Sequence, residues 1–227
     1  MIPSSPFAVL TEDDRPVPAA RQAAFEWSDD QVAALLEASA ARAKRDIAKY
    51  DYTLLLRTTA TLGLRKGEVL GLRWEDFDKE GAFLSVQRQW TAHHVYGPTK
   101  TPAGVRRLAL PADLRDALIA HRLASRFSAD HEPIFASVSG TPLGHRNVTR
   151  RGFEPARDDA GLPNTVTFHD MRHAAASRLI GAGLDPVTVA AVLGHQDATV
   201  TLSVYGHLYD RRRTDEAVRQ ALGFARI

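Results

Sequence analysis

Residues 167–207 read TFHDMRHAAASRLIGAGLDPVTVAAVLGHQDATVTLSVYGH, a run in which capping residues and glycines bracket short apolar segments. Apolar side chains recur at helical spacing between these signals, which predicts helices over about 167–180, 186–193 and 198–205. Thr167 is the expected cap of the first helix, and Asp185 followed by Pro186 is typical of the start of the second. Gly194 is expected to end that second helix. The run therefore predicts three short helices with polar side chains at their ends.

The first of these helices presents an imidazole and a guanidinium together. His169, Arg172 and His173 share one helical face. The apolar stripe beside that face is expected to be buried, and it consists of Phe168, Met171, Ala175 and Leu179. His169 and His173 are also spaced like a metal pair, but the glutamate of a His-Glu-x-x-His site is missing and no third ligand is evident. No metal site is therefore predicted here.

Two further motifs carry candidate reactive groups. Residues 61–74, TLGLRKGEVLGLRW, place Arg65 just after a helix-ending glycine, with Glu68 one turn on, where it can orient the arginine. His195 follows Gly194 at a helix end, and Tyr205 stands ten residues later in Tyr-Gly-His. Each motif alone has an ordinary structural explanation, namely a surface ion pair worth under about 1 kcal/mol, a helix cap or a packed tyrosine.

The rest of the chain predicts more helix and one small sheet. A capping box at 28–31 begins a helix, and further helices are expected over about 46–62, 66–72, 112–127 and 146–160. Short strands are expected at 83–86, 94–96 and 105–110, separated by turns rich in glycine and proline. The predicted fold is mainly α with a small three-stranded antiparallel sheet, an α+β class.

Charge is segregated along a chain whose formal net charge is only +2. Residues 81–112 and 133–153 contain no Asp or Glu. Such stretches predict one face that meets a polyanion, and an ordinary solvated surface is the alternative. The candidate DNA contacts are Arg88, Arg106, Arg107, Arg146, Arg150 and Arg151.

Composition excludes several classes of protein. The chain has no cysteine, its apolar runs are short, and no charged segment followed by an apolar stretch opens it. Disulfides and cysteine metal sites are thereby excluded, and a membrane span and a signal peptide are not expected. We expect a cytoplasmic protein with no membrane partner.

Taken in order, the motifs resemble the tyrosine recombinase, or phage integrase, family. The family pattern is an arginine in a Gly-Leu-Arg-x-x-Glu box, a lysine in a β-hairpin, His-x-x-Arg, Leu-Gly-His and Tyr-x-His. The matching residues are Arg65 with Glu68, Lys100, His169 with Arg172, His195 and Tyr205. The resemblance implies the tyrosine recombinase catalytic-domain fold over residues 27–210. Residues 1–26, with four prolines, are then a linker or strap, and 211–227 form a C-terminal tail helix.

The resemblance also implies a reaction, site-specific recombination or integration of DNA through a 3′-phosphotyrosyl intermediate. Arg65 and Arg172 would grip the non-bridging oxygens of a phosphate, and His195 would add a hydrogen bond. Tyr205 would attack with His169 as acid–base partner, and Lys100 would protonate the leaving 5′-oxygen. Because guanidiniums supply the positive charge, neither a metal ion nor a nucleotide cofactor is expected.

Two features depart from the family pattern. The chain leaves no room for the helical core-binding domain that usually comes first, and the interval from His195 to Tyr205 is one residue longer than in several relatives. The longer interval leaves Tyr209 as a minor alternative nucleophile. The alternative functions are nicking and rejoining of DNA like a type IB topoisomerase, or a non-catalytic DNA-binding module. The expected partners are double-stranded DNA and other copies of the chain, which would be mostly monomeric when free and tetrameric on DNA.

Overall fold

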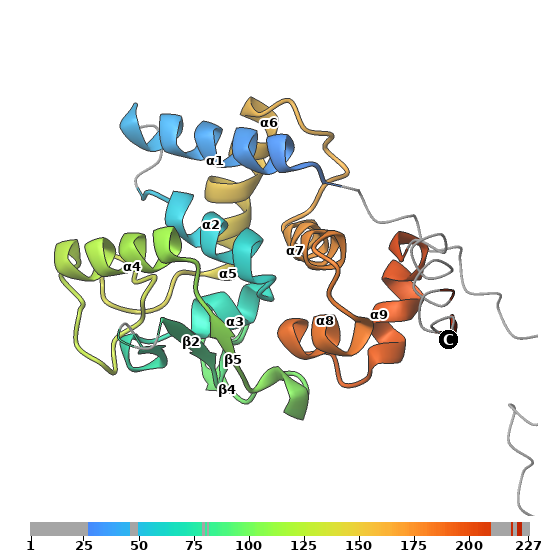
Figure 1. The fold of residues 1–227 in the computed structure, drawn as a ribbon. Coiled ribbons are helices and arrows are strands. Elements are labelled where there is room, and N and C mark those ends of the chain that lie inside the picture. The colour runs from blue at the N-terminus through green and yellow to red at the C-terminus, as the bar shows by residue number, and fades with distance from the viewer. Residues whose placement is uncertain are drawn as a thin grey trace, which may run out of the picture.

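The computed structural model describes residues 27–45, 50–78, 80, 82–209, 219, 222 and 223. Helices dominate this part of the chain (Figure 1). They are α1 (Asp29–Lys44), α2 (Thr53–Leu62), α3 (Lys66–Gly71), α4 (Ala112–Ala124), α5 (His145–Asn147), α6 (Glu154–Asp159), α7 (Asp170–Gly181), α8 (Pro186–Leu193) and α9 (Ala198–Tyr205). The strands are β1 (Phe77–Asp78), β2 (Phe83–Val86), β3 (Gln89–Trp90), β4 (Tyr96–Gly97) and β5 (Arg106–Ala109).

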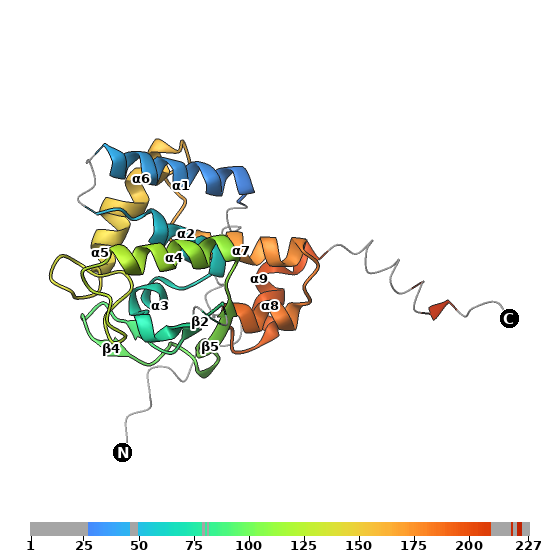
Figure 2. The ribbon, with the colours of Figure 1, turned by 60° about the vertical axis from the view of Figure 1, so that its left-hand side comes forward.

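The helices are arranged around α2, which lies between α1 and α4 and packs on α7 (Figures 1 and 2). Helices α1 and α6 lie side by side at one end of the molecule, and the strands with α3 lie at the other. Helices α8 and α9 pack on each other, and α8 also contacts α7 and β5. In this arrangement the C-terminal ends of α2 and α8 lie close to the N-terminal ends of α7 and α3, in the middle of the molecule.

Capping residues set most of the helix boundaries that the sequence predicts. Ser28 Oγ accepts from Gln31 N (3.2 Å) while Gln31 Oε1 accepts from Ser28 N (2.9 Å), which confirms the capping box of α1. Asp185 accepts from the backbone at the start of α8, and Gly194 ends that helix with a left-handed φ of 68°, both as predicted.

Four predicted helices differ from the observed ones at their ends or along their length. The helix expected over 46–62 starts at Thr53, whose N–H donates to Asp51 Oδ1 (2.8 Å); residues 46–49 lie outside the described part. Helix α7 starts at Asp170 with His169 at the N-cap position, and the Thr167 side chain does not cap it, because Thr167 Oγ1 (2.8 Å) and Thr167 N (2.7 Å) both donate to the Asp170 carboxylate. The helix expected over 146–160 is divided into α5, a π-helical stretch Val148–Phe153, and α6. The helix expected to reach residue 127 ends at Ala124.

The sheet has three antiparallel strands, but one of them is not the strand that was predicted. Strand β2 pairs with β5, Phe83 opposite Ala109, and on its other side with β1. The predicted strand at 94–96 lies instead in a separate hairpin, where Tyr96 pairs with Trp90. The chain leaves the sheet after β2 at Arg88, whose guanidinium pairs with Asp76 (2.6 Å) and Glu75. The hairpin packs instead against α3, where a Cβ on Gly71 would lie 2.8 Å from Gln89 Cα.

The core consists of two clusters of buried side chains. The larger joins α1, α2, α3, the sheet, α4 and the start of α7, and it includes Leu35, Leu56, Leu84 and Met171. The smaller lies between α7, α8 and α9 and contains Ala176, Ile180, Val189, Leu193 and Tyr205. Burial of each large aliphatic side chain stabilises the fold by about 1.5–3 kcal/mol. Tyr205 is therefore held in place by packing as well as by hydrogen bonding.

Two predicted segments cannot be compared with the structure. The linker or strap, residues 1–26, lies outside the described residues, and so does nearly all of the tail helix predicted over 211–227. In the part of the chain that is described, every helix is too short or too polar to cross a membrane.

Candidate active site

Arg172, in the first turn of α7, is the central cation of the site. Its side chain is buried, and Nη1 donates to the carbonyl oxygen of Gly63 (2.7 Å). Its Nη2 is also buried yet has no hydrogen-bond partner among the described residues. Loss of water around the guanidinium lowers the pKa of Arg172 to about 9, and the positive charge of Arg65 acts in the same direction. A buried cation with an unused donor is suited to bind an anion.

Arg65 supplies a second guanidinium at the start of α3. Its Nη1 donates to Glu68 Oε1 (2.7 Å), and Nη2 donates to the carbonyl oxygen of Gly194 (3.2 Å). Burial would raise the pKa of Glu68, but Arg106 and then Arg65 outweigh that effect and hold it below its usual value. Glu68 is thus a carboxylate that fixes Arg65, as its position in the motif predicts.

Arg106 belongs to the inside of the molecule, although it was predicted to contact DNA. Its side chain is only 6% exposed, and its Nη2 donates to Glu68 Oε2 (3.0 Å). Its Nε donates to Val192 O (2.7 Å) and its Nη1 to Gly104 O (2.9 Å), so its donors are engaged within the fold. Alternation along β5 is the signal that could have shown this, because Arg106 shares a face with the buried Leu108. Arg106 therefore braces Glu68 rather than offering a free guanidinium.

Two left-handed glycines present the carbonyl groups that the arginines use. Gly63 has φ 64° at the end of α2, and Gly194 has φ 68° at the end of α8. A Cβ on Gly63 would lie 2.7 Å from Leu193 Cδ2, and one on Gly194 would lie 2.8 Å from Arg106 Nη1. Both positions therefore require glycine for conformation and for space.

The histidines His169 and His195 lie beside the two arginines. His195 Nδ1 is 2.8 Å from the hydroxyl of the buried Thr201 on α9. Loss of water lowers the pKa of His195 to about 4, with Arg172 and Arg65 acting in the same direction, and the pKa of His169 is lowered to about 4 by loss of water, His173 and Arg172. Both rings are therefore neutral hydrogen-bonding groups at pH 7 in the isolated chain.

Tyr205 ends α9 with its hydroxyl against His173. The tyrosine is 4% exposed, and its Oη lies 2.5 Å from His173 Nδ1. Burial raises the pKa of Tyr205 to about 12, although the charge of Arg172 works against this. The sequence does not indicate the contact with His173, because its spacing from His169 suggests only a possible metal pair.

The alternative nucleophile, Tyr209, lies apart from the arginines. Its hydroxyl is buried without a hydrogen-bond partner in the described part of the chain, and burial and then Asp185 raise its pKa. Asp185 stands at the start of α8, whereas His195 and Arg65 gather at the other end of that helix. The geometry favours Tyr205 over Tyr209.

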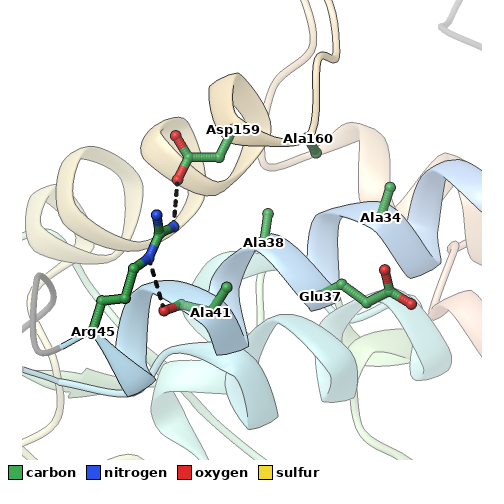
Figure 3. A pocket seen from close by; sticks show the side chains of 7 residues that line it. All are labelled: Ala34, Glu37, Ala38, Ala41, Arg45, Asp159 and Ala160. Carbon is green, nitrogen blue, oxygen red and sulfur yellow. Dashed lines mark hydrogen bonds and ion pairs between the residues drawn. The ribbon is translucent and has the colours of Figure 1, made fainter.

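A histidine pair and a surface groove are two further features of the described residues. The rings of His169 and His173 are perpendicular, 5.3 Å apart, and the described residues contain no group of three or more potential metal-binding side chains. A groove between α1 and α6 has alanine side chains along its floor and an ion pair between Arg45 and Asp159 (3.6 Å) at one end (Figure 3). None of the candidate reactive residues lines that groove.

Comparison with known sequences identifies the family. Residues 27–212 match the model of the phage integrase family. The chain belongs to this family. It is 30% identical over 176 residues to a XerC-like tyrosine recombinase of Caldanaerobacter subterraneus subsp. tengcongensis, covering 67% of this chain and 44% of that protein. The ICEBs1 integrase of Bacillus subtilis is 29% identical over 180 residues, which cover 72% of this chain and 48% of that protein. This member of the family thus spans about half the length of these relatives.

Solved structures of integrases and recombinases share the fold. The Tn1549 transposon integrase in complex with circular intermediate DNA has a TM-score of 0.71 and 22% identity, covering 88% of this chain and 68% of that chain. The XerA recombinase has a TM-score of 0.64 and 20% identity, covering 90% and 68% respectively. The predicted fold, a mostly helical tyrosine recombinase catalytic domain with a small antiparallel sheet, is confirmed.

Lys100 stands apart from the arginine and histidine cluster. The lysine is exposed in the loop between β4 and β5. Its neighbour Thr101 reaches the cluster, because Thr101 Oγ1 lies 3.5 Å from the same Gly194 carbonyl oxygen that Arg65 uses. The loop that carries Lys100 therefore borders the site.

The other predicted DNA contacts divide into paired and unpaired arginines. Arg88 is largely covered and pairs with Asp76, and Arg107 is 54% exposed but pairs with Asp78 (2.8 Å). The remaining three, Arg146, Arg150 and Arg151, are exposed and make no hydrogen bond or ion pair within the described residues. The unpaired group lies on α5 and the π-helical stretch.

Proposed function

We propose that this chain breaks and rejoins DNA strands in site-specific recombination or integration. In this proposal, Tyr205 attacks a backbone phosphate, the P–O5′ bond breaks, and a 3′-phosphotyrosyl link and a free 5′-hydroxyl form. Because the energy of the phosphoester is kept in the covalent link, a second 5′-hydroxyl can reverse the attack without ATP. The matching relatives named as a tyrosine recombinase and an integrase support this class of reaction.

The observation that carries the proposal is the buried Arg172 with its unused Nη2, surrounded by Arg65, His169 and His195. The guanidinium groups of Arg172 and Arg65 can each donate two hydrogen bonds to the non-bridging oxygens of a phosphate. These oxygens gain negative charge in the transition state. Tyr205 is close enough to Arg172 for its phenol to affect the pKa of that arginine. The guanidinium that would bind the phosphate and the tyrosine that would attack it therefore lie in the same part of the site.

Each group has a distinct part in the proposed reaction. Arg65 and Arg172 bind the phosphate. Glu68 holds Arg65 and is itself braced by Arg106, and the neutral His169 and His195 complete the hydrogen bonding. Lys100 protonates the 5′-oxygen once DNA draws the loop over the site.

The proposed partners are double-stranded DNA and further copies of the chain. Neighbouring structures of the Tn1549 integrase were solved in complex with DNA, which supports DNA as the substrate class. Recombination joins two duplexes, so we also propose that the chain assembles as a tetramer on DNA and is mostly monomeric when free. Size-exclusion chromatography with light scattering, with and without DNA, tests this assembly.

A nicked suicide duplex tests the reaction. Cleavage releases a short fragment that cannot be rejoined, so a covalent adduct accumulates. Tyr205→Phe should form no adduct yet keep its fold, because the hydroxyl is the nucleophile while the ring packs unchanged among α7, α8 and α9. Tyr209→Phe is the matched control and should retain the adduct. An adduct at parental yield in Tyr205→Phe, lost instead in Tyr209→Phe, would reject Tyr205 as the nucleophile.

A further inference from the structure

A chain of three polar side chains joins the nucleophile to helix α7. Tyr205 Oη is 2.5 Å from His173 Nδ1, and His173 Nε2 is 3.9 Å from Asp170 Oδ1. A carboxylate can only accept, so a proton on Nε2 faces Asp170 and leaves Nδ1 free to accept the tyrosine O–H. The arrangement has the order nucleophile, imidazole, carboxylate.

We propose that His173 takes the proton of Tyr205 when the phenol attacks phosphate, and that Asp170 orients His173 for this step. The inference rests on the proposed function and names a different proton acceptor from the His169 that the family resemblance implies. As the Tyr205 Oη–P bond forms, the O–H proton passes to His173 Nδ1. The P–O5′ bond breaks, and the leaving oxygen takes a separate proton from Lys100. In the reverse reaction His173 returns its proton to Tyr205.

Geometry separates the two histidines. His173 contacts the reacting oxygen directly, whereas no hydrogen bond joins His169 to Tyr205 in the described part of the chain. The charges that act on His169 include Arg172 and Arg65, the two guanidiniums assigned to the phosphate. His169 is thus placed beside the anion site, and His173 beside the nucleophile.

A buried phenol has particular need of such a base. Burial raises the pKa of Tyr205 to about 12, so very little phenolate is present at pH 7. General base catalysis by a positioned imidazole typically contributes about 10²–10⁴-fold. A base 2.5 Å from Oη can take the proton as the Oη–P bond forms, which avoids a free phenolate.

The surroundings of His173 keep it neutral and therefore able to accept. Loss of water lowers its pKa, Asp170 opposes this, and Arg172 lowers it further, with a net lowering. The other groups that face the ring are Tyr205 from α9 and His169 at the start of α7. As pH rises through this lowered pKa, His173 loses its proton, so the cleavage rate should rise over the same range below the usual value for histidine.

His173→Gln is the first test, measured as the rate of adduct formation on the suicide duplex between about pH 5 and 8. Glutamine keeps a hydrogen-bond acceptor but cannot take a proton, so the rate should fall by at least about 10²-fold and lose its rise with pH. The matched control is His131→Gln, because His131 is exposed and outside the site. Parental rate and pH profile in His173→Gln would overturn the inference, whereas absence of adduct in the unaltered chain would instead overturn the proposed function.

A second substrate distinguishes a base at Tyr205 from an acid at the leaving group. A 5′-bridging phosphorothiolate leaves as a thiolate, which does not need a proton in order to depart. The defect of His173→Gln should persist on this substrate, because the proton of Tyr205 must still be removed. Full recovery on the phosphorothiolate would show that His173 acts on the leaving group and would overturn the inference.

Asp170→Asn provides a second test of His173 as the proton acceptor, which can be used if His173→Gln does not fold. Asparagine retains an oxygen that can accept from Thr167 at the start of α7 but removes the charge that raises the pKa of His173. The rise of the cleavage rate with pH should therefore move to lower pH. An unchanged profile in a folded Asp170→Asn variant, checked by its thermal unfolding, would overturn the role of His173.

Discussion

Arg172 is buried in the fold, and no carboxylate among the described residues pairs with it. Its hydrogen bond is to a backbone carbonyl, that of Gly63, and Glu68 is neutralised by Arg65 and Arg106. Removal of a charge from water costs several kcal/mol even after relaxation of the protein. A phosphate that accepts from Nη2 would offset part of this cost, and the effect would be greatest when the phosphate gains charge in the transition state.

Replacement of Arg172 by lysine keeps the positive charge but removes the planar guanidinium, so it tests which of the two the reaction needs. Arg172→Lys should cleave the suicide duplex at least about 10²-fold more slowly, because an ammonium lacks the planar fork of donors with which a guanidinium can reach the Gly63 carbonyl and a phosphate together. Arg126→Lys is the control, since Arg126 is exposed and without a hydrogen bond or ion pair among the described residues. Cleavage by Arg172→Lys at the parental rate would mean that positive charge alone is sufficient.

At the scale of single residues, the sequence predicted which residues make up the candidate active site better than it predicted the contacts between their side chains. The order and spacing of the motifs located Arg65, His169, Arg172, His195 and Tyr205, and the structure brings them to one region. The roles of Arg106 and His173 depend on contacts across the fold, with Glu68 38 residues away and with Tyr205 32 residues away. Spacing along one element does not encode such contacts, although strand alternation could have shown that Arg106, predicted as a DNA contact, faces inward.

At the scale of the element, helix ends were predictable and the smallest strands were not. Asp185, Gly194 and the capping box act locally, so the sequence signals are sufficient. Strands β1, β3 and β4 have only two residues each, too few for alternation to be detected. Their partners are close in the sequence, Phe77 opposite Leu84 and Gln89 opposite Gly97, so the shortness of the strands limits their prediction.

The helix end at Gly63 connects stability to the site. Gly63→Ala should lower the free energy of unfolding by about 1–2 kcal/mol from its left-handed φ alone, with crowding of Leu193 in addition. Because Arg172 donates to the Gly63 carbonyl, adduct formation should also fall. The measurements are thermal unfolding and the suicide-duplex assay.

Gly161→Ala is a matched control for this substitution. Gly161 has a similar φ of 69°, but a Cβ there would meet nothing within 4 Å. The control should therefore show the backbone cost without crowding and should keep the parental adduct yield. Equal losses of stability and of cleavage in the two variants would mean that the close approach at Gly63 has no bearing on the site.

At the scale of the whole molecule, charge is distributed between internal structure and surface. Many arginines in the basic stretches are paired, among them Arg88, Arg106 and Arg107, so the stretch 81–112 offers less free positive charge than its composition suggests. Arg146, Arg150 and Arg151 gather on one short segment, α5 with the π-helical stretch, and are exposed. That segment is the better candidate for contact with the DNA backbone.

DNA binding by this chain should accordingly be weak and should fall steeply as salt is raised. Each phosphate that an arginine neutralises releases counterions and contributes about 0.9 to the slope of log affinity against log salt. The double variant Arg146→Gln with Arg150→Gln should therefore bind more weakly to all sequences and lower that slope by about 2. Arg126→Gln, which removes one positive charge from the exposed segment after α4, should change the slope little. Fluorescence anisotropy over a series of salt concentrations gives the affinity and the slope.

A double variant with the parental slope would show that Arg146 and Arg150 do not contact phosphates. A slope equally reduced in Arg126→Gln would show that binding responds to net charge and not to the segment that carries Arg146 and Arg150.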